Sequence, residues 1–300
     1  MQATRHDHTF ESQGTSCAGW LYEPTAVEQP PVVVMAHGFG GERTWRLPAF
    51  AERFAEAGIA TFLFDYRTFG DSEGEPQNLI DPFEQRADWH AAVDYVQSLP
   101  EVDGDSIALW GSSFSGGHVV EVAARRDDVA AVVAQVPFVD GARTVGKLVR
   151  AGGFAYLENA VTAAIRDLGR IVLRREPYYV PLAGPPEEFA ILNTPDAMDG
   201  IEALIPEGEE WDNRCPARIA LTVLFYRPIS RASDVEVPVF VVQAEDDTII
   251  PDATTDRLVR ELDDVERVRY PVGHFDVYRG DPFENIVSRQ RDFLRRHLRG

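Results

Sequence analysis

Ser113 lies in the segment 111–117, Gly-Ser-Ser-Phe-Ser-Gly-Gly, between a strand predicted over Ile107–Trp110 and a helix predicted over Val119–Arg126. A sharp turn from a strand into a helix leaves its serine exposed above the helix N-terminus, where unpaired N–H groups favour negative charge. Ser113 is therefore a candidate nucleophile for attack on a carbonyl carbon. The backbone N–H of Phe114 is a candidate donor to the oxygen that becomes charged.

The turn differs at one position from the usual G-x-S-x-G pattern, because Ser115 stands where the last glycine is expected. Serine is small, so the turn can still close without a steric collision. The segment holds three serines, and the spacing from Gly111 selects Ser113 among them. Ser113 could instead be only the N-cap of the helix, but that role would not need the acid and base described next.

A carboxylate and an imidazole stand in the chain where they can activate this serine. His274 follows the last predicted strand, Val265–Tyr270, and Asp247 follows the strand before it, predicted over Val237–Val242. A serine hydroxyl becomes a nucleophile when an imidazole removes its proton and a carboxylate orients that imidazole. His274 is the candidate base and Asp247 the candidate acid, with the adjacent Asp246 as the alternative acid.

The loop that follows the predicted strand Pro31–Ala36 reads His-Gly-Phe-Gly-Gly over residues 37–41. Glycines allow a loop to turn its backbone N–H groups inward, so the N–H of Phe39 is the candidate second oxyanion donor beside that of Phe114. His37 is expected to brace this loop. The other histidines are expected to be structural or exposed: His6, His8, His90, His118 and His297.

The charge balance of the chain excludes some partners. The formal net charge is −20 at pH 7, and Lys147 is the only lysine beside 28 arginines. An acidic surface repels nucleic-acid phosphates and anionic lipid, so no nucleic-acid or membrane partner is expected. An acidic excess with almost no lysine is typical of proteins from a high-salt cytoplasm, whereas a GC-rich genome alone explains only the missing lysines.

Other features of the sequence bear on the location of the protein, on its cysteines and on cofactors. No run of apolar residues approaches the about 20 needed to span a bilayer, and the N-terminus lacks an apolar signal region, so a cytoplasmic location is expected. Cys17 and Cys215 are expected to be reduced and buried. No cluster has metal-ligand spacing, so neither a metal nor another cofactor is expected. The chain is compatible with a homo-oligomer.

Short β-rich segments alternate with helical patterns, which predicts a mostly parallel sheet of eight strands with flanking helices. Asp81 and Asp281 each precede a proline and are expected to cap helices. Residues 140–232 break the alternation, because helical stretches there flank a proline-rich segment, and they are too long for a simple crossover. The predicted organisation is a core of residues 1–139 and 233–300 with a helical lid inserted at 140–232.

Several of these motifs, in this order, resemble the α/β-hydrolase superfamily over about residues 16–139 and 233–300. The chain is most similar to its dienelactone-hydrolase-like and acetyl-xylan-esterase-like branch, which includes thiohydrolases and acyl transferases of polyketide pathways. The resemblance implies an α/β-hydrolase fold and acyl transfer through an acyl-serine intermediate. Dienelactone hydrolases proper have a cysteine as nucleophile, where this chain has Ser113. The motifs that carry the resemblance are residues 37–41, 64–67, 70–72 and 111–117, Asp247 and His274.

The expected function is hydrolysis of a small-molecule carboxylic ester or thioester by the triad Ser113, His274 and Asp247. An acyltransferase would use the same acyl-enzyme with an alcohol in place of water. An amidase or peptidase is the other alternative within hydrolysis. Aromatic residues of the 140–232 segment suit an apolar acyl pocket, although each could equally pack the lid onto the core.

Overall fold

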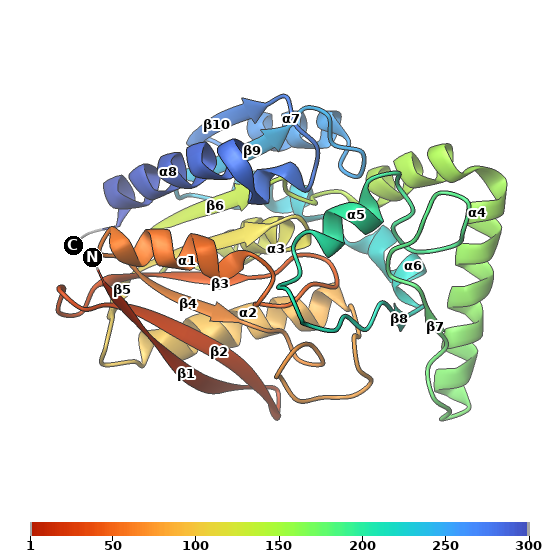
Figure 1. The fold of residues 1–300 in the computed structure, drawn as a ribbon, viewed down its shortest axis with the longest axis horizontal. Coiled ribbons are helices and arrows are strands. Elements are labelled where there is room, and N and C mark those ends of the chain that lie inside the picture. The colour runs from red at the N-terminus through yellow and green to blue at the C-terminus, as the bar shows by residue number, and fades with distance from the viewer. Residues whose placement is uncertain (1, 299–300) are drawn as a thin grey trace.

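An eight-stranded sheet forms the centre of the molecule in a computed structural model, which describes residues 2–298 (Figure 1). The strand order is β1-β2-β4-β3-β5-β6-β9-β10. β2 pairs antiparallel with both β1 and β4, and all other neighbours are parallel. The strands are β1 Ala3–Ser12, β2 Thr15–Pro24, β3 Pro31–Ala36, β4 Ala60–Phe64, β5 Asp103–Ser112, β6 Ala131–Gln135, β9 Val239–Ala244 and β10 Val265–Tyr270.

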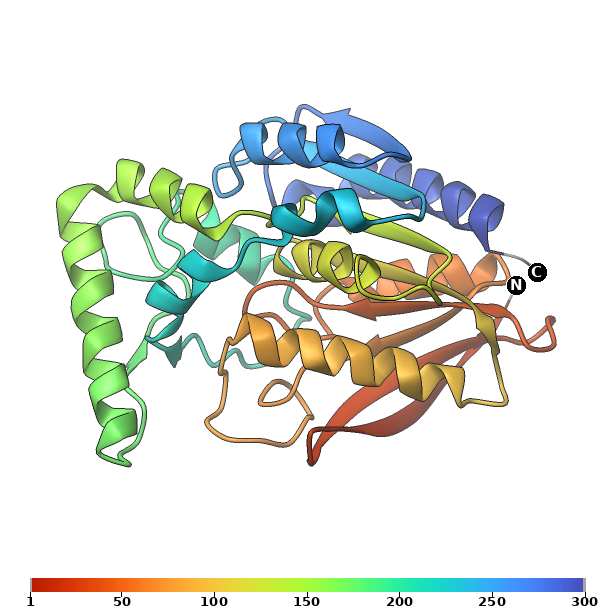
Figure 2. The ribbon, with the colours of Figure 1, turned by 180° about the vertical axis from the view of Figure 1, so that it is seen from behind.

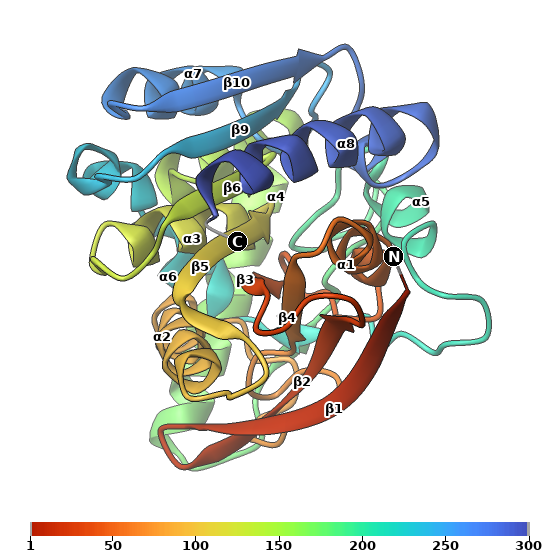
Figure 3. The same cartoon turned by 90° about the vertical axis from the view of Figure 1, so that its left-hand side faces the viewer.

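Helices cover both faces of the sheet, which explains why its central strands are continuous apolar runs. All six residues of β3 are buried, as expected for a parallel strand between two helical layers. α1 and α8 lie on one face, and α2, α3 and α7 lie on the other (Figures 2 and 3). The helices are α1 Leu47–Glu56, α2 Pro82–Gln97, α3 Phe114–Ala123, α7 Asp252–Glu261 and α8 Gly280–His297.

Residues 140–232 leave the sheet after β6 and return before β9. They lie beside the ends of the strands from which the candidate residues project (Figure 1). The segment has little strand structure, as its proline content predicts. Its elements are α4 Gly141–Val172, β7 Tyr179–Val180, α5 Ala197–Glu202, β8 Cys215–Pro216, α6 Ile219–Thr222 and the short 3₁₀ helices Val223–Phe225 and Pro228–Asp234.

α4 consists of two parts, because Gly153 has non-helical angles (φ 70°, ψ −166°) inside it. Beyond this kink, one side of the helix is buried against the protein, through Tyr156 and Ala164. The opposite side is apolar and exposed: Phe154 and Val172 have 78% and 83% of their surface accessible. Figures 1 and 2 show this part of α4 as the outer edge of the molecule.

The predicted sheet and flanking helices are confirmed, and the differences concern element ends. β1 begins at Ala3, and its whole length pairs with β2. α3 begins at Phe114 instead of Val119. Helix propensity does not predict the first turn of α3, because this turn contains Gly116 and Gly117 and glycine disfavours helix interiors. Both are needed for close packing: a Cβ on Gly117 would lie 2.0 Å from the carbonyl oxygen of Phe138.

Smaller expectations had mixed outcomes. Asp81 caps α2, because its side chain accepts hydrogen bonds from the first turn. The prediction for Asp281 is wrong: α8 begins at Gly280, two residues before the start that an Asp281 cap implies, and Arg279 occupies the N-cap position. Cys17 and Cys215 are buried, free thiols. Among residues 2–298, no helix is long and apolar enough to cross a membrane.

Candidate active site

Ser113 sits at the sharp turn between β5 and α3, in a backbone conformation that non-glycine residues rarely adopt. Its angles are φ 57° and ψ −117°, and such strain persists only where the surrounding structure enforces it. The enforcing contacts come from the end of β6. The N–H of Ser113 donates to the carbonyl of Gln135 (2.8 Å), and the N–H of Phe138 donates to the carbonyl of Ser113 (2.8 Å).

The small residues around Ser113 are required by packing, as the sequence predicts. A Cβ on Gly111 would lie 2.2 Å from the carbonyl oxygen of Ser115, far inside contact distance. Ser115 is also more than a small substitute for glycine. Its hydroxyl lies 2.6 Å from the hydroxyl of Tyr66, which in turn accepts a hydrogen bond from the indole N–H of Trp89 (2.8 Å). This buried chain anchors the start of α3 to its neighbours.

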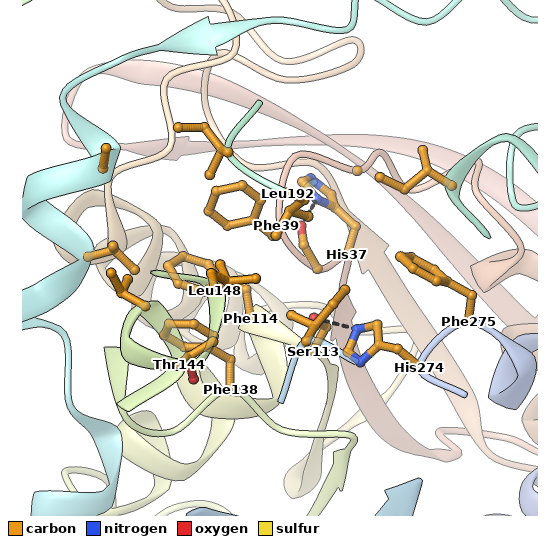
Figure 4. A pocket seen from close by; sticks show the side chains of 18 of the residues that line it. His37, Phe39, Ser113, Phe114, Phe138, Thr144, Leu148, Leu192, His274 and Phe275 are labelled. Carbon is orange, nitrogen blue, oxygen red and sulfur yellow. Dashed lines mark hydrogen bonds between the residues drawn. The ribbon is translucent and has the colours of Figure 1, made fainter. Parts of the chain in front are cut away.

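The three candidate catalytic side chains form one hydrogen-bonded series. His274 Nε2 lies 3.0 Å from Ser113 Oγ, and His274 Nδ1 lies 2.6 Å from Asp247 Oδ2 (Figure 4 shows the first pair). The second carboxylate oxygen of Asp247 accepts the backbone N–H groups of Ile249 (2.8 Å) and Ile250 (2.7 Å). The loop after β9 therefore holds the carboxylate in one orientation.

Of the two candidate acids, the structure places Asp247 against the base. Asp247 is buried, whereas Asp246 is exposed and binds the carbonyl of Val272 through its backbone N–H. A carboxylate at Nδ1 favours the tautomer with the proton on that nitrogen. Nε2 then has its lone pair free to accept the hydroxyl proton of Ser113, which is the arrangement that a general base needs.

The glycine-rich loop 37–41 lies directly beside the serine. A Cβ on Gly38 would be 3.1 Å from Ser113 Cβ and 3.7 Å from its Oγ. The rings of Phe39 and Phe114 meet edge to face at 5.4 Å, and Figure 4 shows both close to Ser113. Phe114 is the first residue of α3, so its N–H has no partner within the helix. Both residues predicted to supply oxyanion donors thus adjoin Ser113.

His37 and His118 are buried but lie outside the series. His37 Nδ1 lies 3.0 Å from the carbonyl oxygen of Gly38, consistent with a role in bracing the loop. His118 lies between the hydroxyl of Tyr226 (2.6 Å) and the side-chain oxygen of Gln85 (3.1 Å). Burial lowers the pKa of His37 to about 4 and that of His118 to about 3, so both are neutral near pH 7.

Residues 33–289 match the sequence profile of the Alpha/beta hydrolase family. The chain belongs to this family. A quorum-quenching protein, AidA of Acinetobacter baumannii (strain MDR-ZJ06), is 40% identical over 97% of this chain and 94% of its own. The polyketide transferase grgF of a Penicillium species is 30% identical over 98% of this chain and 97% of its own.

Solved structures show the same relationship. The structure of DcsB in complex with its substrate analogue has a TM-score of 0.85 and 25% sequence identity. The match covers 98% of this chain and all of that one. Relatives along the full length support hydrolase or acyl-transfer activity for this α/β hydrolase.

The α/β hydrolase has an apolar pocket, and Ser113 and His274 are among the residues that line it (Figure 4). One wall is the loop 37–41 and the start of α3. The other wall comes from residues 140–232. Its apolar lining from that segment includes Val145, Leu148, Val149, Tyr156, Leu157, Ala160, Val161, Ile191, Leu192, Ile201, Leu204, Ala220, Leu221, Val223 and Leu224.

Glu42 is the carboxylate that lines this pocket among the described residues. Burial raises its pKa to about 7, and repulsion from the carboxylates of Asp65, Glu209 and Asp71 adds to the effect. Its ionisation therefore changes the charge at the pocket wall close to neutral pH. Nothing in the local sequence distinguishes Glu42, since its burial depends on the fold.

A buried polar chain behind the nucleophile is also absent from the sequence prediction. Ser112 Oγ lies 2.5 Å from the hydroxyl of Tyr278 and accepts a hydrogen bond from Gln135 (3.2 Å). Gln290 donates to Gln135 (2.9 Å) and accepts from the indole of Trp110 (3.0 Å). The chain connects β5, β6, α8 and the loop that carries His274. The chain therefore links the strand that precedes Ser113 to the loop that carries His274.

Proposed function

We propose that this protein is a serine hydrolase that cleaves a carboxylic ester or thioester through an acyl-serine intermediate. The observation that carries the proposal is the series Ser113–His274–Asp247, with distances of 3.0 and 2.6 Å, at the end of an apolar pocket. The Ser113–His274 distance falls within the hydrogen-bond reach required of a general base, and the Asp247–His274 bond orients the imidazole without taking its proton.

In the proposed reaction, Ser113 Oγ attacks the carbonyl carbon of the substrate while His274 Nε2 takes the hydroxyl proton. The N–H groups of Phe39 and Phe114 hold the oxygen that becomes negative. His274 then gives its proton to the leaving alcohol or thiol, and the carbon–oxygen or carbon–sulfur bond breaks. A water molecule, deprotonated by the same imidazole, releases the acid and restores Ser113.

The apolar lining of the pocket suits a substrate whose acyl group or alcohol is hydrophobic. We infer that residues 140–232 act as a lid, since most of the apolar lining of the pocket comes from them. Such a wall shields the site from bulk water and thereby strengthens the electrostatic interactions inside. The expected partner is accordingly a small-molecule ester or thioester.

Acyl transfer to an alcohol is the second candidate function. It is favoured by the likeness to a polyketide transferase along almost the whole chain. The same acyl-enzyme would then meet an acceptor hydroxyl instead of water. Product analysis separates the two candidates: incubation with an acyl ester and a range of alcohols gives free acid from a hydrolase and a new ester from a transferase.

Fluorophosphonate labelling, competed with thioesters and p-nitrophenyl esters of increasing acyl length, tests the proposed nucleophile. Ser113→Ala is expected to abolish labelling and to lower kcat by roughly 10⁴-fold or more. Ser115→Ala is the matched control, because it changes a serine of the same turn that faces Tyr66. Labelling at another serine in the wild-type protein would refute the assignment.

A further inference from the structure

Lys147, the only lysine of the chain, makes two hydrogen bonds to the loop that carries Asp247. Its Nζ donates to the carbonyl oxygen of Asp247 at 2.6 Å and to that of Ile250 at 3.0 Å. Lys147 belongs to α4 and the loop follows β9, so one hundred residues of sequence separate the partners. The contact joins the 140–232 segment to the core at the position of the candidate acid.

Two sets of hydrogen bonds hold the loop around Asp247. Within the loop, Asp247 Oδ1 accepts the N–H groups of Ile249 and Ile250. From α4, the Lys147 ammonium group donates to the carbonyl oxygens at both ends of the same turn. Charge-assisted hydrogen bonds of this kind are stronger than those between neutral groups. Together they leave the carboxylate little freedom to rotate away from His274.

The same part of α4 forms a wall of the pocket. Val145 and Leu148, on either side of Lys147 in the sequence, line the pocket that Ser113 and His274 share. The helix turn that binds the acid loop is therefore also part of the pocket wall. No other side chain of the 140–232 segment has a described hydrogen bond to this turn's backbone.

The geometry of the contact suits lysine better than arginine. An ammonium group carries three donors around one atom, so two carbonyl oxygens can converge on it. A guanidinium group spreads its donors over a rigid plane that matches a carboxylate instead. Lysine thus occupies this position in a chain whose other basic side chains, apart from histidine, are arginine.

We propose that Lys147 is a positioning residue that fixes the Asp247 carboxylate against His274 and couples the pocket wall to the triad. The inference rests on the proposed function, in which Asp247 orients the base. Lys147 itself touches neither substrate nor the reacting atoms in this scheme. Its loss acts on the rate of the chemical step, through the orientation of the imidazole, more than on substrate binding.

The test measures KM and the kcat per active site. The active sites are counted by fluorophosphonate titration. Lys147→Met keeps the length of the side chain and removes both hydrogen bonds. It is expected to lower kcat about 10- to 100-fold, as small misplacements of catalytic groups do, while KM changes little. Arg150→Met, on the next turn of α4, is the matched control because Arg150 is exposed, and it is expected to behave as wild type.

A second variant, Lys147→Gln, keeps a polar group at the site and decides the matter if Lys147→Met does not fold. A purely structural role would reduce the number of titratable sites and the melting temperature but leave kcat per site unchanged. Either folded variant with kcat per site within about twofold of wild type overturns the proposal.

Failure of the proposed function would be seen separately, as absence of turnover of all esters and thioesters by the wild-type protein. The second-order rate constant for labelling of Ser113 by the fluorophosphonate then replaces kcat, since it needs the triad but no substrate. Slower labelling of folded Lys147→Met, relative to both wild type and Arg150→Met, supports the positioning role. Equal labelling rates overturn it.

Discussion

Asp247→Asn is the substitution that tests the role of the acid most directly. Asparagine has the same shape, and its amide oxygen can keep the two bonds to the N–H groups of Ile249 and Ile250 (2.8 and 2.7 Å). Its amide nitrogen then faces His274 Nδ1 in place of the carboxylate oxygen at 2.6 Å. Two donors cannot share this bond, so the imidazole is forced to carry its proton on Nε2.

The expected loss of kcat follows from this change of tautomer. With its proton on Nε2, His274 donates to Ser113 and cannot accept the hydroxyl proton. The corresponding change in a serine protease lowers kcat about 10⁴-fold, which is about 5.4 kcal/mol of lost transition-state stabilisation at 1.36 kcal/mol per tenfold. The free energy of unfolding should change little, because both loop bonds persist. Asp247→Ala would instead leave two buried N–H groups unpaired, at about 1–3 kcal/mol each.

Ester hydrolysis, normalised to the concentration of folded protein, and urea unfolding together check this reasoning. Asp246→Asn is the matched control, because it makes the same change on the adjacent, exposed residue. It is expected to retain full kcat. A kcat of Asp247→Asn above about a tenth of wild type, or a larger loss in Asp246→Asn, would refute the role assigned to Asp247.

Three further predictions concern packing, stability and specificity. Gly111→Val adds a side chain where a Cβ already lies 2.2 Å from the carbonyl oxygen of Ser115, so calorimetry should find a melting temperature lower by about 5 °C or more; an unchanged value contradicts this. Burial lowers the pKa of His118 from 6.5 to about 3, so the unfolded state binds the extra proton and stability falls as the pH drops below 6.5. Urea unfolding at pH 7 and pH 5 should therefore show a smaller loss for His118→Gln than for wild type. Because the pKa of Glu42 is about 7, Glu42→Gln should lower KM for acyl chains that bear a carboxylate at pH 8 but not at pH 6, and equal effects at both pH values argue against the assignment.

The sequence predicted the central sheet and the meeting of three side chains for a simple physical reason. The carboxyl ends of parallel strands share one edge, so residues just after β5, β9 and β10 lie close together even when far apart in sequence. Asp247 could not be separated from Asp246 by that reasoning. The choice depends on which of two adjacent side chains turns inward, and the loop bonds to Ile249 and Ile250 decide it.

The side chains that hold the candidate catalytic residues in place could not be predicted from the sequence, because their contacts join distant segments. Lys147 is one hundred residues from Asp247, and Tyr278 is 166 residues from Ser112. Lys147 stands out in composition, but no local pattern shows what it contacts. The catalytic roles, the lid, the cytoplasmic location and the absence of nucleic-acid and membrane partners stay predictions, as does the link between acidic composition and a high-salt host.

The apolar outer side of α4 bears on how this protein behaves in concentrated solution. Exposed side chains such as Phe154 and Val172 favour self-association by burying apolar surface. A net charge of −20 opposes every close approach of two copies. That opposition has a range of about 8 Å at 0.15 M ionic strength and about 3 Å at 1 M. Colloidal stability is therefore set by ionic strength, with repulsion dominant in dilute salt and attraction along α4 gaining as salt rises.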